Sequence, residues 1–118
     1  MAVANFYAQV LFHRRVFSVH NPPSPLHRQA LGHILEIARR QYSWDPRLLR
    51  RLLWPLLMAV IETDDPRQRE WARQRLGDLR DFHSEYSWAN RVADEVLAEQ
   101  ERNGVDVNLF EFLSTHVQ

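Results

Sequence analysis

The chain has 118 residues and a mass of 14.1 kDa, the size of a single domain. Its 45% hydrophobic and 25% charged residues are typical of a soluble globular protein, so we expect one domain over residues 1–118. It has no cysteine and three glycines, which excludes disulfides, thiolate metal sites, a cysteine nucleophile and a glycine-rich phosphate loop. No apolar run reaches the roughly 18 residues of a membrane span.

The charges are balanced in number but divided along the chain. Residues 1–60 hold eight arginines and two acids, for +6, and residues 61–118 hold seven arginines and thirteen acids, for −6. Lysine is absent, which fits a GC-rich genome as well as selection for arginine–carboxylate pairs. The division predicts either two faces that attract each other or two partners of opposite sign.

Helix starts and stops are well marked. Ser24-Pro25, Asp45-Pro46 and Asp65-Pro66 each place a capping oxygen before a proline at a first helical position. Gln68 follows Asp65 at capping-box spacing, and Asn103-Gly104 is a helix stop.

These signals and the apolar periodicity predict an all-α fold of about six helices in antiparallel pairs. The expected helices cover residues 2–19, 25–42, 46–62, 66–82, 85–102 and 107–115. The starts recur at about 20-residue intervals, which is also typical of a helical-repeat solenoid, but the segments that follow them are not alike.

The first expected helix is apolar over most of its circumference. Its predicted inward stripe is Phe6, Tyr7, Val10 and Phe17, and further apolar residues lie outside that stripe. A helix of this kind is buried on more than one side, which predicts an oligomer or protein-partner contact through it. The inward positions predicted for the second, fourth, fifth and sixth helices are Leu31, Ile34, Leu35 and Ala38; Trp71, Ala72, Leu76 and Leu79; Ala89, Val92, Ala93, Val96 and Leu97; and Phe110 and Leu113.

The third expected helix, 46–62, is divided by Pro55. A proline inside a helix removes one backbone donor and clashes with the preceding turn, so we expect a kink there. The six apolar residues 56–61 that follow predict a segment enclosed on all sides at the centre of the core. Before the proline, one face of the helix carries Arg47, Arg50, Arg51 and Trp54. This face suits a phosphate, nucleic-acid or partner surface, or a solvated face that pairs with the acidic half of the chain.

The sequence shows only weak patterns of the kind that indicate a catalytic or metal-binding site. Glu62 and Asp64 could form an acid–base pair, but a capped turn with local ion pairs explains them as well, and no nucleophile is apparent nearby. The six histidines, at positions 13, 20, 27, 33, 83 and 116, contain no His-x-x-x-His pair and are interpreted as surface residues. We therefore predict no catalytic residue, metal or cofactor. The tryptophans Trp44, Trp54, Trp71 and Trp88 are expected to pack in the core with their N–H groups on carbonyls, or alternatively to line a small-molecule pocket.

Two segments together resemble a known family. Residues 54–59, 61–66, 69–71 and 75–76 (WPLLMA, IETDDP, REW and RL) look like the C-terminal part of the fungal-specific transcription factor domain. Residues 7–17 (YAQVLFHRRVF) are similar to the family's helix before a proline-rich loop. Val60 stands where many relatives carry glycine. The zinc-cluster module that precedes this domain in many fungal regulators is not in the sequence, so the chain is expected to be a fragment or relic of a larger regulatory domain.

The resemblance implies a regulatory, non-catalytic function and a nuclear location. It implies structural roles for Pro55 at the kink, Glu62 and Asp65 at the turn, and Arg69 and Trp71 in docking the fourth helix. Without the zinc cluster, we do not expect this chain alone to bind DNA. Protein partners or self-association through the first helix are expected, and the family leaves a small-molecule effector open. The alternative is a small helical ligand-binding protein or enzyme on the same scaffold.

Overall fold

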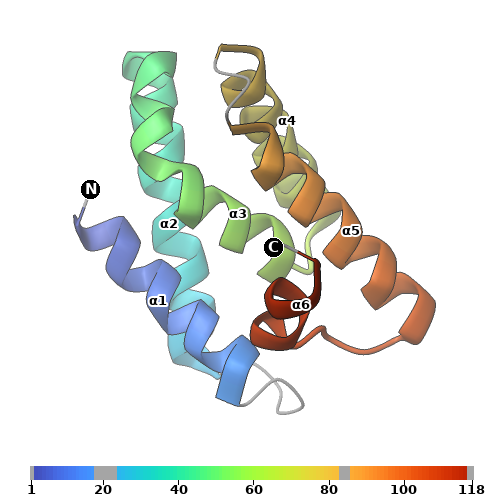
Figure 1. Ribbon diagram of the computed structural model, residues 1–118. Coiled ribbons are helices and arrows are strands. Elements are labelled where there is room, and N and C mark those ends of the chain that lie inside the picture. Colours follow the sequence, from blue (N-terminus) through green and yellow to red (C-terminus); the bar gives the residue numbers. More distant parts are fainter. Residues whose placement is uncertain (1, 18–23, 83–85, 117–118) are drawn as a thin grey trace.

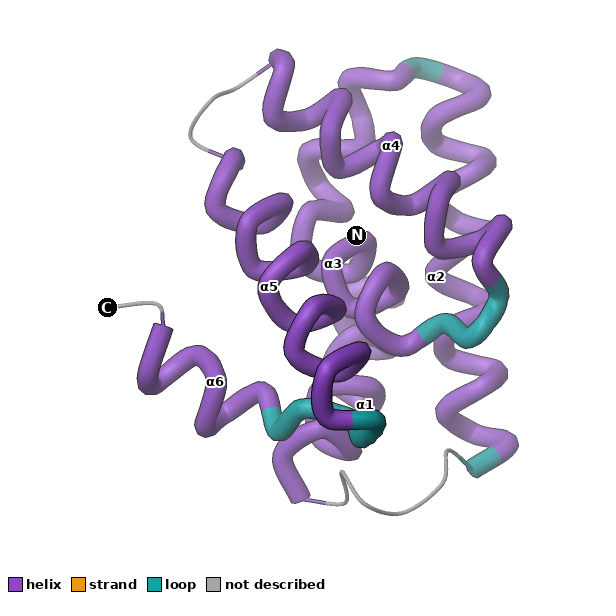
Figure 2. Tube along the Cα trace, turned by 90° about the vertical axis from the view of Figure 1, so that its right-hand side faces the viewer, coloured by secondary structure: helices purple, strands orange, loops and turns teal. Residues whose placement is uncertain are grey.

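The computed structural model describes residues 2–17, 24–82 and 86–116, and this part of the chain contains helices and no strand (Figure 2). The elements are α1 (Ala2–Phe17), α2 (Pro25–Trp44), the 3₁₀ helix η1 (Pro46–Leu52), α3 (Leu53–Glu62), α4 (Pro66–Phe82), α5 (Ser87–Asn103) and α6 (Leu109–His116). The all-α fold class is therefore confirmed. The predicted residues 18 and 19 of the first helix and 85 of the fifth lie outside the described residues.

Helix α3 is the centre of the molecule. It contacts α1, α2, α4 and α5, and Figure 1 shows it crossing between the α1–α2 pair and the α4–α5 pair. Every residue from Pro55 to Glu62 is buried, which confirms the enclosed segment expected from the sequence. Each large apolar side chain buried here contributes about 1.5–3 kcal/mol relative to an exposed one, so this short helix supplies a large share of the core.

The prediction of a single helix over residues 46–62 is wrong, because the chain forms η1 and then α3 there. Pro55 lies in the first turn of α3, where a backbone N–H would have no partner within the helix, so the proline is accommodated at the junction. The ribbon changes direction there (Figure 1). In η1 the three-residue period places Leu49 and Leu52 on the buried face.

The predicted helix starts at Ser24, Asp45 and Asp65 have the expected side-chain caps. The Ser24 hydroxyl accepts a hydrogen bond from the His27 backbone N–H (3.4 Å), and His27 Nδ1 closes a capping box on the Ser24 N–H (3.0 Å). The Asp45 carboxylate accepts from the Arg47 backbone N–H (3.0 Å). The same carboxylate pairs with the Arg47 guanidinium, and these hydrogen bonds hold the pKa of Asp45 below its ordinary value.

The start of α4 differs from the expected capping box. Asp65 accepts from the Arg67 N–H (2.9 Å) as predicted, but Gln68 bonds the Thr63 hydroxyl (2.8 Å) rather than the Asp65 backbone. The Thr63 hydroxyl in turn accepts the Asp65 N–H (3.2 Å). The predicted stop of α5 is confirmed, because Gly104 adopts φ 70°, a left-handed conformation that favours glycine.

The inward stripe predicted for the first helix is wrong at two of its four positions, since Tyr7 and Val10 pack partly buried against the core but the phenylalanines do not. Phe6 and Phe17 are 64% and 73% exposed, whereas Ala4, Ala8 and Leu11 are buried against α2 and α3. The small alanines allow α1 to approach its neighbours closely. The two phenylalanines consequently lie on the solvent side.

The sixth helix is also rotated from its expected orientation. Leu109 and Phe112 are buried and Phe110, which was expected inside, is 62% exposed, while Leu113 packs partly buried against the core as expected. Asn108 fixes this rotation, because its side chain accepts the Glu111 N–H (3.1 Å) and donates to the carbonyl of Val16 in α1 (3.1 Å). Most other inward positions are confirmed as buried: Ile34, Leu35 and Ala38; Ala72, Leu76 and Leu79; and Ala89, Val92, Ala93 and Val96. Leu31, Trp71 and Leu97 are partly buried against the core.

Candidate functional site

The C-terminal end of α3 is buried, and arginines from two other helices bind its carbonyls. The last carbonyls of an α-helix have no partner within the helix, so a buried end needs donors from elsewhere. Arg15 of α1 donates to the Ile61 carbonyl (3.1 Å). Arg69 of α4 donates to the carbonyls of Val60 (3.0 Å) and Thr63. The two guanidinium groups thereby join α1 and α4 to the central helix.

A buried group of charges surrounds the same helix end. The carboxylate of Glu62 accepts from Arg14 Nη1 at 3.2 and 3.3 Å and from Arg15 Nε. The side chains of Arg14, Arg15 and Glu62 are only 3%, 2% and 3% exposed. At this degree of burial, the removal of one partner would leave an uncompensated charge in the interior.

Residues from the connection between α5 and α6 complete the network. Arg14 Nη2 pairs with Asp106 at 2.8 Å, and Arg15 pairs with the same carboxylate at 3.6 Å. Arg15 also donates to the side-chain oxygen of Gln100, which accepts the Val107 N–H at 3.1 Å. We call Arg14, Arg15, Glu62 and Asp106 the ion-pair cluster. Two cations meet two anions in it, so its formal charge is zero.

The ion-pair cluster accounts for the orientation of α1. Within the described residues, the ion pairs of this cluster join the basic half of the chain to the acidic half. The other ion pairs each lie within one half. A rotation of α1 that buried Phe6 and Phe17 would withdraw Arg15 from Glu62. Breaking a buried ion pair costs about 3–5 kcal/mol, which is comparable with the gain from covering two rings, so the pair opposes that rotation.

As a result, α1 presents an apolar stripe to solvent. We call this stripe the outward face of α1. Its residues alternate in steps of three and four, and they are Val3, Phe6, Val10, His13 and Phe17. Val3 is 59% exposed, Val10 is partly buried, and the His13 ring lies 4.6 Å from the Phe17 ring. Contiguous exposed apolar residues of this kind mark interaction surfaces.

Arg69→Lys should destabilise the protein by about 1–3 kcal/mol, because one ammonium group cannot span the Val60 and Thr63 carbonyls as the guanidinium does. Partial burial lowers the pKa of Arg69 from its ordinary value, but a guanidinium stays charged near neutral pH. Urea unfolding measures the difference. Arg67→Lys is the matched control, since Arg67 is exposed, and an equal loss in both variants would contradict the capping role.

The structure divides the predicted arginine–tryptophan face. Because η1 has three residues per turn, Arg47 and Arg50 lie on one side of it and Arg51 on another, whereas Trp54 belongs to α3. Trp54 packs on the core with its ring 5.4 Å from the Phe12 ring, and the three arginines are exposed. The four residues therefore do not form one continuous surface.

The other predicted signature residues lie around α4. Pro55 is buried in the first turn of α3, and Asp65 caps α4 as described above. Trp71 packs edge-on against Tyr42 of α2 at 6.2 Å, and the guanidinium of Arg75 lies 4.2 Å from the Tyr42 ring centre. Trp71 therefore contacts α2, whereas Arg69 contacts α3.

The tryptophans do not line a shared pocket. Trp44 is 85% exposed, which contradicts the expectation that all four pack in the core. The buried indole N–H of Trp54 has no hydrogen-bond partner among the described residues, contrary to the expected carbonyl. Trp71 and Trp88 are partly buried against the core.

The predicted acid–base pair does not have the environment of a general acid and base. Glu62 is held by two arginines, while Asp64 is exposed. Both line a recess of about 40 Å³ with His27, which is too small for a substrate. Burial lowers the pKa of His27, and its ring already serves the cap of α2, so this histidine is not simply a surface residue.

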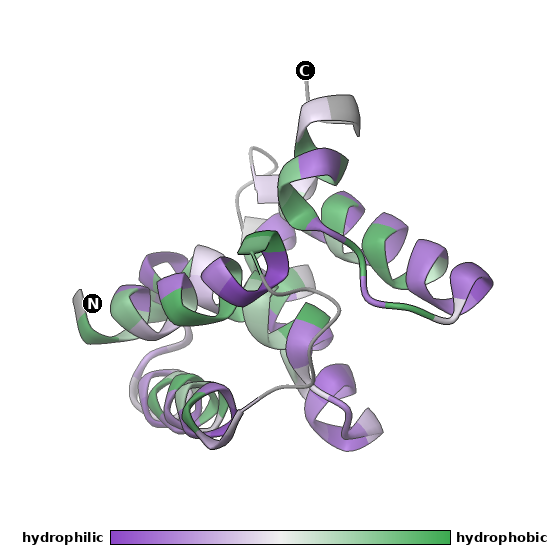
Figure 3. Cartoon of the chain, turned by 90° about the horizontal axis from the view of Figure 1, so that it is seen from below, coloured by the Kyte–Doolittle hydropathy of each residue, from purple (hydrophilic) through white to green (hydrophobic). Residues whose placement is uncertain are grey.

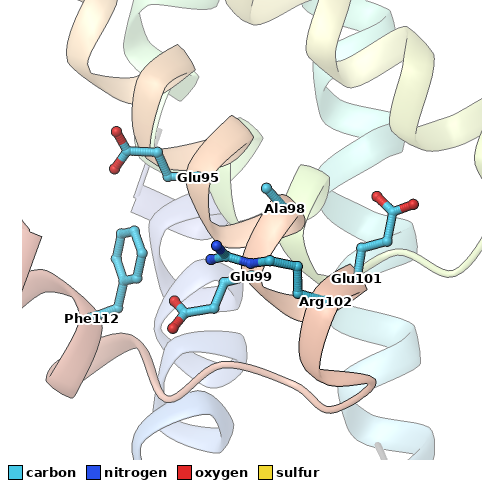
Figure 4. A pocket seen from close by; sticks show the side chains of 6 residues that line it. All are labelled: Glu95, Ala98, Glu99, Glu101, Arg102 and Phe112. Carbon is cyan, nitrogen blue, oxygen red and sulfur yellow. The ribbon is translucent and has the colours of Figure 1, made fainter.

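A larger recess, of about 680 Å³, opens between α5 and α6. Figure 4 shows Glu95 and Glu99 on the side of α5 that faces Phe112, whereas Glu101 points away. Seen from below, the hydrophilic C-terminal end of α5 extends to the periphery of the molecule (Figure 3). The recess is a shallow, mainly acidic surface that can attract cations.

Sequence reasoning assigned no role to Arg14, Arg15, Gln100 or Asp106. The feature of the sequence that could have indicated this cluster is a pair of adjacent arginines in a helix that has no acidic residue of its own. Within the described residues, no group of three His, Asp or Glu side chains is placed to hold a metal ion. None of the helices in that part of the chain has both the length and the apolar character of a membrane span.

Comparison with known proteins identifies a family. A family model described as the fungal specific transcription factor domain matches residues 2–114, nearly the whole chain. The chain matches no curated protein and no solved structure. The matched range extends from α1 through α6, so it includes both the ion-pair cluster and the outward face of α1. The family indicates a regulatory role in transcription, a nuclear setting and a non-enzymatic class of protein. This chain therefore belongs to the fungal specific transcription factor domain family.

Proposed function

We propose that this chain is a non-catalytic protein-interaction module of a nuclear transcription regulator, and that the outward face of α1 is its contact surface. The observation that carries the proposal is the exposure of Phe6 and Phe17 on a helix that is otherwise well packed. Covering an aromatic or large aliphatic side chain contributes about 1.5–3 kcal/mol, so two exposed phenylalanines on one stripe give a partner a substantial apolar contact.

Family membership supports this proposal, since it indicates regulation of transcription. Neither of the two recesses described above favours an enzyme or a ligand-binding protein, because the one between α5 and α6 is shallow and acidic and the one beside Glu62 cannot admit a substrate. The exposed arginines of η1 do not favour a nucleic-acid surface either, since Arg47 is paired with Asp45 and the remaining arginines do not lie in one row.

A reporter assay tests the proposal. The full chain is fused to a heterologous DNA-binding module in a fungal cell, and transcription is compared with that from the DNA-binding module alone. We expect the fusion to change transcription and Phe6→Ser to abolish the change, because a hydroxyl replaces the ring at the contact.

Phe110→Ser is the matched control, since Phe110 is 62% exposed and Phe6 is 64% exposed, but Phe110 lies on α6. Immunoblots establish equal protein levels. If Phe6→Ser has no effect, or if both substitutions have the same effect, the outward face of α1 is not the contact surface.

A further inference from the structure

We propose that the partner of the outward face of α1 is a second copy of this chain, with the two α1 helices antiparallel and Val10 at the two-fold axis. This inference rests on the proposed function, because it names the occupant of the same surface. Three properties of that surface support it: its spacing, its charge and its size.

The spacing suits a helix–helix seam. Steps of three and four residues, repeated from Val3 to Phe17, follow the period of helices that pack side by side. At about 1.5 Å per residue the seam is roughly 21 Å long. In an antiparallel pair centred on Val10, the smaller Val3 of one copy faces the larger Phe17 of the other at each end. Opposing a small side chain with a large one fills the contact without a clash.

The charge of α1 favours an identical partner. Its two cations, Arg14 and Arg15, would make two copies repel each other if they lay on the surface. Both are instead buried and paired with Glu62 and Asp106, so neither arginine lies on the outward face. A strongly charged partner finds no complement there. An antiparallel arrangement also brings opposite ends of the two helix dipoles together.

The apolar area of the outward face of α1 limits how tightly two copies of the chain can bind each other. A phenylalanine buries about 150–250 Å², so a seam containing two of them per copy buries less than the roughly 1,200 Å² of a stable interface. The Phe6 and Phe17 rings already contact Tyr7 and His13, which reduces the entropy lost when they are covered. We therefore expect a reversible dimer with a dissociation constant on the order of 10⁻⁵ M.

Sedimentation equilibrium of the purified chain tests this inference over micromolar to millimolar concentrations. We expect the mass to rise from 14.1 kDa towards twice that value with concentration. Val3→Glu and Phe17→Arg change exposed positions and should leave the fold intact, as circular dichroism will show. Each variant alone should dimerise at least about tenfold more weakly, because each copy places one charge, and the dimer therefore two, in an apolar seam.

An equimolar mixture of the two variants should recover association. In the antiparallel pair, Glu at position 3 of one copy meets Arg at position 17 of the other, while the opposite end keeps Val3 against Phe17. Phe110→Arg is the control and should dimerise like the unchanged chain. A mixture that does not recover overturns the antiparallel arrangement.

A chain that stays monomeric at every concentration overturns the inference as a whole. The proposed function is tested separately, because the reporter assay does not require self-association. If Phe6→Ser still abolishes the reporter effect of a monomeric chain, the outward face binds a different protein and the proposed function stands. If neither assay responds to the outward face, both proposals fail.

Discussion

Glu62→Gln is expected to lower the free energy of unfolding by about 3–5 kcal/mol. Glutamine has nearly the same shape as glutamate and keeps one acceptor oxygen, so the substitution removes mainly charge. Arg14 and Arg15, at 3% and 2% exposure, would then share only Asp106, whose side chain is 38% exposed. Two guanidinium groups in a dry interior with one partly solvated carboxylate between them are under-compensated.

Urea unfolding followed by circular dichroism measures this loss. The matched control is Glu36→Gln, which makes the same chemical change at the exposed i,i+4 pair with Arg40. An exposed pair contributes about 0–1 kcal/mol, so the control should be nearly neutral. If Glu62→Gln were equally neutral, water would have to reach the ion-pair cluster, and our account of the orientation of α1 would fail.

Leu56→Ala is expected to cost about 2–5 kcal/mol. Leu56 is fully buried at the start of α3, and α3 is packed by four other helices, so its surroundings cannot collapse easily into the space left by the substitution. The same urea experiment measures the loss. Leu26→Ala at a 57% exposed position of α2 is the control, and a comparable loss there would show that α3 is not the centre of the core.

The fold class and the central helix could be predicted from the sequence because their signals are local. The capping residues Ser24, Asp45 and Asp65 act within three residues of their own positions, and an unbroken apolar run is enclosed in any fold that buries it. The left-handed stop at Gly104 is local in the same sense.

The orientation of α1 could not be predicted in this way. Judged by hydrophobicity alone, Phe6 and Phe17 belong inside and Arg15 outside, and the structure has the reverse. The deciding contact joins Arg15 to Glu62, 47 positions later in the chain, and no local pattern reports such a pair. The rotation of α6 depends in the same way on a distant contact, between Asn108 and the Val16 carbonyl.

The break between η1 and α3 was missed for a different reason. The arginines at 47, 50 and 51 were placed on one face by assuming 3.6 residues per turn up to Pro55. With three residues per turn, the same arginines fall on two sides. The predicted basic face thus depended on a helical period that η1 does not have.

The arginine caps on α3 also bear on how the chain opens. Arg15 and Arg69 bind the end of the same helix from α1 and α4, so neither outer helix can detach without exposing carbonyls of α3. Amide hydrogens of α1, α3 and α4 should therefore exchange with deuterium at similar, slow rates, as one cooperative unit. The same contacts tie Glu62 to Arg14 and Arg15 of α1, so substitutions at these buried positions are expected to occur together among related sequences.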